Sequence, residues 1–186
     1  MIVYDLIGHI IPLSVELKIR LDSILKERTF KKKEFLLKEG QVSNHVYFIE
    51  KGLVRIYYIK DDLEICSGLL LEGGVMISVN SFFNREKSYE YMQAIEETIV
   101  HYISFDELES LYRDFIEFNI VGRKLITDYY VRSEERNYLL RRQSAEEKFQ
   151  SFQRLFGADT VRIPRKDIAS YLGINLETLS RLTKKI

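Results

Sequence analysis

The stretch RKDIASYLGINLETLSRLTKKI, residues 165–186, decides the fold of the C-terminal part of the chain. Ala169 is small where two short helices would cross, and Gly173 permits the positive φ that a tight turn between them requires. The apolar side chains on the inward faces are Ile168, Leu172, Ile174, Leu179 and Leu182. Agreement at all these positions predicts a helix-turn-helix rather than a helical hairpin that serves only packing.

The outward face of the second helix carries groups of the kinds that reach base edges and phosphates from a major groove. These groups are Glu177, Thr178, Ser180, Arg181 and Lys184. Arg181 can donate two hydrogen bonds to guanine, and Glu177 can accept one from the cytosine amino group. Asn175 is well placed to cap this helix. For Lys184 and Lys185, a solvated terminus and phosphate contact are equally good interpretations.

Charge is distributed unevenly, although 28 basic and 28 acidic residues give a net charge of zero. Residues 148–186 carry a net charge of +5, and the remainder carries −5. A basic terminal domain on an acidic body is expected where the terminal domain binds a polyanion. We therefore expect double-stranded DNA as its partner.

Residues 35–103 follow a different pattern, with short runs rich in Val, Ile, Tyr and Phe. Gly40, Gly52, the pair Gly73-Gly74 and a polar stretch at 84–87 separate these runs. Many short strands with turn signals at this spacing predict an antiparallel barrel or sandwich. The single cysteine, Cys66, excludes a disulfide framework and an all-cysteine metal site within one chain, and is best interpreted as a buried small hydrophobe.

Helical periodicity flanks the predicted strands on both sides. After Pro12 and Ser14, the apolar spacing predicts a short helix ending near the basic run 31–33. A second short helix is predicted at 106–112, followed by a long one at 115–142, which at ~1.5 Å per residue exceeds what a compact domain needs to cover its core. We expect the long helix to bury one face against a second copy of the chain.

A capping box at 144–147 then opens a helix that Gly157 can terminate. The predicted fold is α+β: an antiparallel β-roll or jelly-roll barrel at 1–112, a dimerisation helix at 113–142 and a helix-turn-helix domain at 143–186. The N-terminus has no signal-peptide features and the longest apolar runs are too short to span a bilayer, so we expect a cytoplasmic protein without a membrane partner.

The whole of residues 13–186 resembles the Crp/Fnr superfamily, the cyclic-AMP receptor protein and its relatives. The resemblance rests on VYFIEKGLVRIYY (46–58), LLLEGGVMISVNSFF (69–83), the long helix and IPRKDIASYLGINLETLSRLTKKI (163–186). It implies a homodimeric transcription regulator that reads an inverted repeat. Glu177-Thr178-Leu179-Ser180-Arg181 is similar to the E-x-x-S-R pattern of the Fnr branch, which implies TTGA-like half-sites read by Glu177, Ser180 and Arg181. Arg165 and Thr178 match positions that contact the phosphate backbone in relatives.

The sequence departs from that pattern where an effector would bind. Cyclic-nucleotide binders have a Gly-Glu-Leu segment where this chain has Ile77-Ser78-Val79, and an Arg-Ser pair where alignment places Ser88-Tyr89. A buried phosphate would lack its charge partner, which argues against cyclic AMP. We expect an unidentified small-molecule effector, if there is one, near Ser78, Val79, Ser88, Tyr89 and Tyr129. Tyr57, Tyr89, Tyr91 and Tyr129 either line such a cavity or fill the barrel, and filling is the preferred interpretation.

No catalytic residue, metal site or cofactor is predicted. The Fnr-type cysteine cluster is missing, and His9, His45 and His101 are scattered, so they favour ordinary core or surface roles over haem ligation. RNA polymerase is a possible partner. Relatives continue past the recognition helix into a β-hairpin wing, and without one we expect modest, strongly salt-dependent DNA affinity. Two alternatives stay open: a cupin-like small-molecule enzyme, and an effector-binding module whose C-terminal helices only dock a protein partner.

Overall fold

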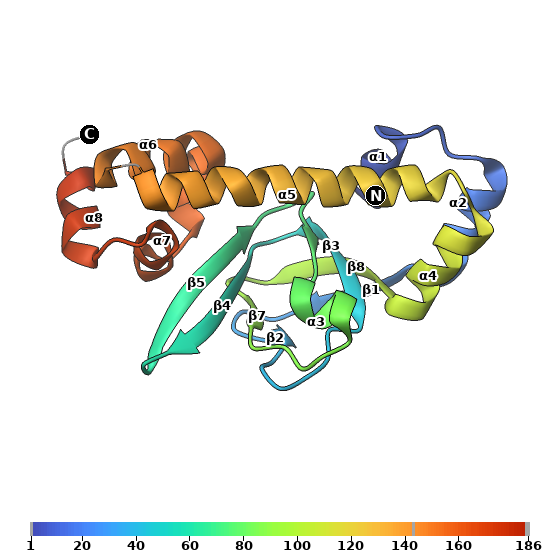
Figure 1. Ribbon diagram of the computed structural model, residues 1–186, viewed down its shortest axis with the longest axis horizontal. Coiled ribbons are helices and arrows are strands. Elements are labelled where there is room, and N and C mark those ends of the chain that lie inside the picture. Colours follow the sequence, from blue (N-terminus) through green and yellow to red (C-terminus); the bar gives the residue numbers. More distant parts are fainter. Residues whose placement is uncertain (1, 143, 185–186) are drawn as a thin grey trace.

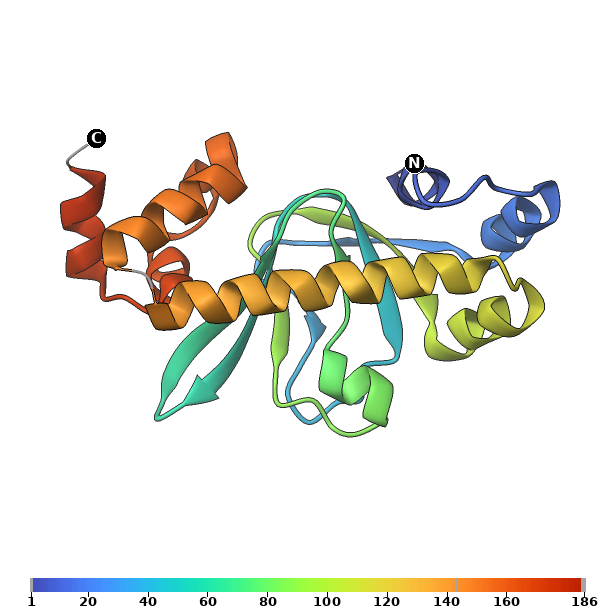
Figure 2. The same cartoon turned by 45° about the horizontal axis from the view of Figure 1, so that its top comes forward.

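A two-sheet β-domain lies under a long helix, with helices gathered at both ends (Figure 1). The computed structural model describes residues 2–142 and 144–184. Helices α1 (Ile2–Gly8), α2 (Val15–Ile24) and α4 (Phe105–Asp114) lie at one end of the long helix, and the C-terminal helices lie at the other (Figure 2). The predicted α+β architecture, with its antiparallel β-domain, long helix and C-terminal helices, is confirmed.

The β-domain consists of two four-stranded antiparallel sheets, with strand orders β1-β8-β3-β6 and β2-β7-β4-β5. The strands are β1 (Lys26–Phe30), β2 (Phe35–Leu37), β3 (His45–Lys51), β4 (Val54–Lys60), β5 (Leu63–Leu70), β6 (Val75–Met76), β7 (Tyr91–Ala94) and β8 (Thr98–Ser104). Side chains from both sheets interdigitate around Ile49, Val54 and Met92, which are fully buried. Alternation along each strand therefore builds the core between the sheets.

The turn between β3 and β4 depends on Gly52. Its φ is +110°, and a Cβ there would lie 2.5 Å from Thr98 Oγ1 and 2.7 Å from Thr98 Cα. Glycine is therefore required here for two reasons: the backbone has a positive φ, and β8 approaches too closely for a side chain. The resemblance to the Crp/Fnr superfamily implies a hairpin around Lys51-Gly52, but the two strands do not pair: β3 pairs with β6 and β8, whereas β4 pairs with β5 and β7, so the turn joins the two sheets.

The N-terminal helices differ from the prediction. Helix α2 (Val15–Ile24) is capped by Ser14 as expected, but it ends at Ile24 rather than near residues 31–33. Residues 26–30 form β1 instead, because all five of them pair with β8. Helix α1 (Ile2–Gly8), which the sequence analysis did not predict, buries Val3 and Ile7 against the same apolar cluster as α2.

The long helix α5 spans Phe118–Arg142 and begins three residues later than predicted. The preceding α4 (Phe105–Asp114) starts with a capping box of Ser104 and Glu107 and closes with Phe115 as its C-cap, so the chain turns before α5. A short helix α3 (Val79–Asn84) follows β6. Gly122 is needed where α5 meets α4, because a Cβ there would lie 2.4 Å from the Tyr112 hydroxyl.

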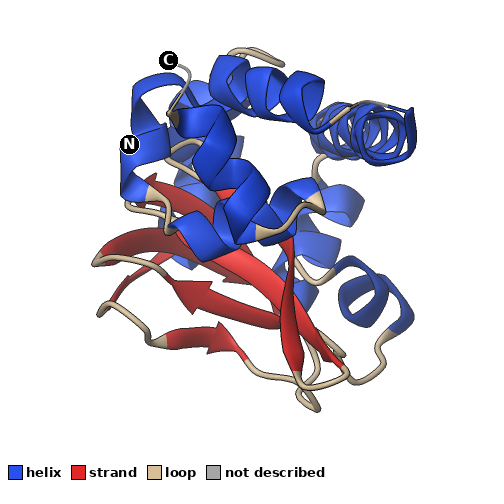
Figure 3. Ribbon diagram, turned by 90° about the vertical axis from the view of Figure 1, so that its left-hand side faces the viewer, coloured by secondary structure: helices blue, strands red, loops and turns tan. Residues whose placement is uncertain are grey.

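The C-terminal domain follows the prediction closely. Helix α6 (Ala145–Phe156) opens with the Ser144/Glu147 capping box and ends at Gly157, and a 3₁₀ helix η1 (Gly157–Arg162) connects it onward. Helices α7 (Arg165–Leu172) and α8 (Leu176–Thr183) follow. Their apolar cluster includes Leu53, Cys66, Leu69 and Ile95 of the β-domain, so the two parts share one core. Figure 3 shows the C-terminal helices in front of the strands.

Among the described helices, none combines the length and the apolar character that crossing a bilayer requires.

Candidate nucleic-acid interface and effector region

The turn between α7 and α8 has the geometry that the sequence predicted. Gly173 adopts the left-handed conformation at φ 62° and ends α7, and the Asn175 side chain accepts a hydrogen bond from the Thr178 backbone N–H to cap α8. Ile168, Leu172 and Leu179 are buried. Ile174 and Leu182 are partly buried against them. Packing of this kind fixes the angle between the two helices and leaves the opposite face of α8 to solvent.

The predicted DNA-contacting side chains lie together on that outward surface. Glu177, Arg181 and Lys184 are exposed, while Thr178 and Ser180 are half-buried. The exposed Arg165 of α7 donates to Ser180 Oγ at 3.0 Å and to Thr183 Oγ1 at 3.0 Å. Arg181 donates to Thr178 Oγ1 at 3.2 Å. These bonds orient two guanidinium groups over one face, where either can bind an anionic or hydrogen-bonding partner.

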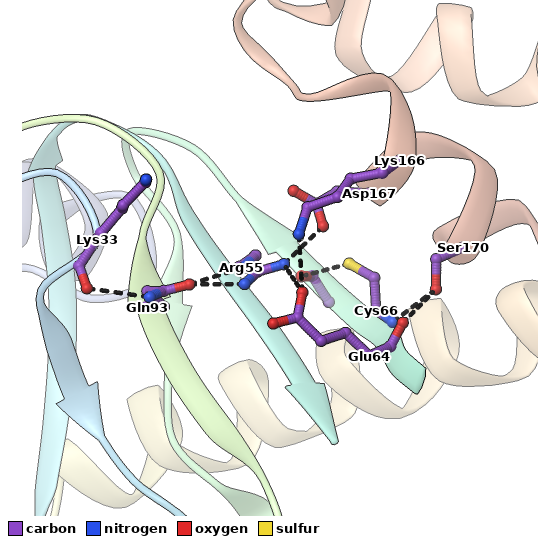
Figure 4. Close-up of polar contacts among 9 residues, drawn as sticks. Lys33, Arg55, Glu64, Cys66, Gln93, Lys166, Asp167 and Ser170 are labelled. Atoms are coloured by element: carbon purple, nitrogen blue, oxygen red, sulfur yellow. Dashed lines mark hydrogen bonds and ion pairs between the residues drawn. The ribbon is translucent and has the colours of Figure 1, made fainter. Parts of the chain in front are cut away.

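A polar network joins this helix-turn-helix to the β-domain, and Arg55 of β4 is its centre (Figure 4). The Arg55 guanidinium lies 2.8 Å from Asp167 of α7 and 2.8 Å from Glu64 of β5. Both Arg55 and Asp167 are buried. Arg55 donates two further hydrogen bonds to the side-chain amide oxygen Oε1 of Gln93, at 2.7 and 3.0 Å. The exposed Lys166 binds Glu64 at 2.9 Å on the solvent side.

Two further contacts cross the same boundary. The Cys66 backbone N–H donates to Ser170 Oγ of α7 at 2.8 Å. Arg162 of η1 pairs with Glu72 at 2.7 Å and with Glu96, both in the β-domain. The Arg162 guanidinium lowers the pKa of the Glu72 carboxyl to about 2. The helix-turn-helix is therefore held to the β-domain by a buried pair and by a more exposed one.

Cys66 lies in this boundary as a buried side chain, as expected from the sequence. Burial raises the pKa of its thiol to about 12, so the thiol is neutral at physiological pH. A neutral buried thiol is a poor nucleophile, which fits a packing role.

The residues expected near an effector are brought only partly together. Ser78 and Ser88 are buried, with their hydroxyl oxygens 3.0 Å apart, whereas Val79 at the start of α3 is half-buried. Tyr89 and Tyr129 are 54% and 55% exposed, so neither fills the barrel. Of the other two tyrosines considered, Tyr57 is buried and stacks on Tyr91 with ring centroids 5.0 Å apart. The preferred interpretation, filling, is thus right for Tyr57 and wrong for Tyr89 and Tyr129.

Both Ser78 and Ser88 contact Glu90, a residue that the sequence analysis missed. Its carboxylate accepts from Ser78 at 2.9 Å and from Ser67 at 3.3 Å, and its backbone N–H donates to Ser88 at 2.9 Å. Burial raises the pKa of this carboxyl above its ordinary value. The only sequence signal was its place between two tyrosines, Tyr89 and Tyr91, at the start of a predicted strand.

Two hollows lie elsewhere. One of about 390 Å³ runs along α5 beside Tyr112 and Ile126, and another of about 300 Å³ opens beside Arg28 and Tyr47. The predicted effector residues line neither of them. The histidines remain apart: in the described part of the chain, no three His, Cys, Asp or Glu side chains are grouped to hold a metal ion.

Residues 27–115 match the model of the cyclic nucleotide-binding domain family. Over 179 residues the chain is 27% identical to the anaerobic regulatory protein of Pasteurella multocida, covering 90% of this chain and 65% of that protein. It is also 27% identical, over 187 residues, to the transcriptional activator protein Anr of Pseudomonas protegens, covering 92% of this chain and 76% of the relative. The chain thus spans slightly less than two thirds of the first of these relatives and about three quarters of the second.

Solved structures agree with this assignment. FixK2 from Bradyrhizobium japonicum superposes with a TM-score of 0.72 at 26% identity, over 87% of this chain and 84% of that one. CooA from Carboxydothermus hydrogenoformans, at 20% identity, shares the fold with a TM-score of 0.70. The named relatives are regulators, and they match the two-sheet domain, the long helix and the C-terminal helices together. The chain as a whole is therefore similar to transcription regulators of the Crp/Fnr superfamily.

Proposed function

We propose that this protein is a DNA-binding transcription regulator that works as a homodimer and reads an inverted repeat through the major groove. The observation that carries the proposal is the exposed face of α8, where Glu177 and Arg181 project from a helix whose turn, cap and packing are those of a helix-turn-helix. Because Arg165 and Lys184 lie on the same exposed surface, phosphates flanking the bases would find positive charge there. The half-sites expected are TTGA-like.

The proposed dimer uses α5. Ile120, Val131 and Tyr138 lie 11 or 7 residues apart, hence close to one face of a helix with 3.6 residues per turn. They are 44%, 49% and 55% exposed. Exposed apolar side chains in a row on a 25-residue helix favour burial against a second copy. Two recognition helices related by a two-fold axis would then address half-sites about 10 bp apart, centre to centre.

Selection of bound sequences from a random DNA pool tests the reading head, which is the helix-turn-helix of α7 and α8 in each subunit. We expect an inverted repeat of TTGA-like half-sites, with Arg181→Ala losing ~1–3 kcal/mol of discrimination at one guanine. Arg154→Ala is the matched control, because Arg154 is an exposed arginine of the same domain that lies on α6 and not on the helix-turn-helix itself. Recovery of the same preference from the Arg181 variant would remove Arg181 from base reading.

Sedimentation of the DNA-free protein tests the dimer separately. Val131→Lys should shift the chain to monomer, because a charge would be buried in the proposed interface. Ile19→Lys, an equally drastic change at a 64% exposed position of α2, should leave the dimer intact. A dimer that survives Val131→Lys would place the interface elsewhere.

Control by an effector is part of the proposal, and cyclic AMP is not the effector we expect. Ser78 donates to the Glu90 carboxylate, and Ser88 contacts Ser78 and the Glu90 backbone, so a carboxylate lies where a cyclic phosphate would need positive charge. A second negative charge placed against this carboxylate would be strongly repelled in a partly dehydrated site. The relative placement of the two reading heads about α5 would respond to a ligand that binds beside the helix.

A further inference from the structure

Glu90 is an acidic side chain without a cationic partner in the described part of the chain. Its carboxylate has hydroxyl donors, Ser67 and Ser78, but it forms no ion pair with any described lysine, arginine or histidine. Burial raises the pKa of its carboxyl, and the serine hydrogen bonds only partly offset this. A half-buried carboxylate without a counter-charge is an unfavourable arrangement that binding of a cation would relieve.

Tyr89, the neighbour of Glu90 in the chain, brings further aromatic rings to this region. The rings of Tyr58 and Tyr89 meet edge to face, with centroids 6.4 Å apart. Burial raises the pKa of the Tyr89 and Tyr129 phenols, and the charge of the nearby Glu90 raises both pKa values further. Tyr89 and Tyr129 are more than half exposed, so their rings are available to a ligand. The faces of tyrosine rings attract organic cations.

We propose that Glu90, with the rings of Tyr58, Tyr89 and Tyr129, forms a binding site for a small organic cation of the ammonium or guanidinium class. A protonated nitrogen would form a charge-assisted hydrogen bond to the carboxylate while its substituents contact the rings. The serine hydroxyls fix the carboxylate from behind, because Ser78 and Ser67 hold one oxygen each. The inference rests on the proposed effector control and names the chemical class of the effector.

The location of the site gives the cation a means of action. Tyr58 belongs to β4, Tyr89 and Glu90 precede β7, and Tyr129 belongs to α5, so a ligand there would join the β-domain to the long helix (Figure 1). Ser67, which binds Glu90, directly follows Cys66, whose backbone N–H contacts Ser170 of the helix-turn-helix. Occupation of the site therefore acts on both elements that carry the reading head.

The test is a titration of the full, DNA-free chain, with its tyrosine rings labelled for NMR and assigned by Tyr→Phe variants. The probes are methylammonium, guanidinium, tetramethylammonium and benzylammonium chlorides; potassium chloride, tert-butanol and benzyl alcohol are the controls. We expect at least one cation to shift the rings of Tyr58, Tyr89 and Tyr129 saturably, and the neutral isosteres not to do so. Absence of a saturable shift with all four cations, or an equal response to potassium chloride, would overturn the proposal.

Variants separate charge from packing. Glu90→Gln removes the charge; its amide oxygen accepts from one serine, and its NH2 group faces the other, whose hydroxyl oxygen can accept. This variant should weaken the affinity for the cation at least tenfold. Tyr89→Leu, at an exposed position, should weaken the affinity for the cation about two- to fivefold. Glu39→Gln is the matched control, because Glu39 accepts from the Tyr91 hydroxyl at 3.0 Å outside the site. Shifts that persist in the Glu90 variant, or saturable binding of inorganic phosphate at these rings, would assign the site to another ligand class.

This experiment contains no DNA, so its result is independent of the reading head. Cation binding without a selected DNA motif would keep the site and contradict the proposed function. A selected motif without cation binding would keep the regulator and contradict the site.

Discussion

Replacing Arg55 by methionine should separate the helix-turn-helix from the β-domain. Methionine has a similar reach but no charge, so Asp167 would stay buried without the guanidinium that binds it at 2.8 Å. The Asp167 side chain is 5% exposed and cannot recover its lost partner by turning to water. Glu64, in contrast, keeps Lys166. The damage therefore falls on one carboxylate of α7.

The magnitude follows from that burial. Removing one partner of a buried ion pair typically costs ~3–5 kcal/mol, because the remaining charge is uncompensated. The Arg28–Glu34 pair is the matched control, since its side chains are 55% and 37% exposed. Arg28→Met should cost ~1 kcal/mol or less. The double variant Arg55→Met/Asp167→Asn removes both charges and should regain much of the loss, with a coupling free energy of ~2 kcal/mol between the two positions.

Urea unfolding gives the change in the free energy of unfolding of each variant, and native-state hydrogen exchange shows where stability is lost. We expect the amides of α7 to lose protection first, while those of the central strand β3 keep theirs. The effect should hardly change between 0.1 and 0.5 M salt, because a buried pair is screened little. If Arg55→Met costs no more than Arg28→Met, or if the coupling to Asp167 is absent, the buried pair does not hold the two parts together.

Three further results are expected. Gly173→Ala should destabilise the chain by ~1–2 kcal/mol, measured by thermal unfolding, because a Cβ at φ 62° is strained even though its nearest neighbour lies 3.6 Å away. Because Arg162 lowers the pKa of Glu72 to about 2, the stabilisation from this pair is present above the ordinary value near 4.5 and is lost as pH falls toward 2; the excess acid sensitivity should vanish in Glu72→Gln. Ser170→Ala removes the acceptor of the Cys66 N–H. This variant should leave cation binding and DNA sequence preference unchanged but reduce the effect of the cation on DNA affinity. If that effect is undiminished, the Cys66–Ser170 contact does not connect the cation site to the helix-turn-helix.

The C-terminal domain was predictable because its signals are local. A capping box, a left-handed glycine and an Asn cap each act within four residues, and the structure has all three at Ser144, Gly173 and Asn175. The same local reasoning failed at β1, where the sequence KERTF is polar and four of its five residues are exposed. Its strand conformation comes from pairing with β8, some 70 residues away. Tertiary pairing there prevailed over the weak local pattern.

The two most consequential side chains were missed for the same reason. Arg55 meets Asp167 across 112 residues, and nothing in RIYYI marks its first residue as buried. Glu90 stands in an alternating segment where a charged residue is normally solvent-facing. Its serine donors come from positions 12 and 23 residues earlier in the chain. Sequence patterns identify elements and their faces, but pairings between distant elements depend on how those elements pack.

Strand β5 connects the two regions that the sequence could only treat separately. Ser67 is the extra residue of a β-bulge, because Ile56 pairs with Gly68 and Tyr57 pairs with Cys66. The Ser67 hydroxyl binds Glu90, whereas the Cys66 backbone contacts Ser170 of α7 and Arg136 of α5. Helix α7 has little freedom to move independently of the β-domain, because the buried Arg55–Asp167 pair joins them. A shift of β5 at Ser67, where it binds the Glu90 carboxylate, would therefore also move α7 through the adjacent Cys66. A cation at Glu90 would thus change the position of α7 through packed contacts, with no need for a separate hinge.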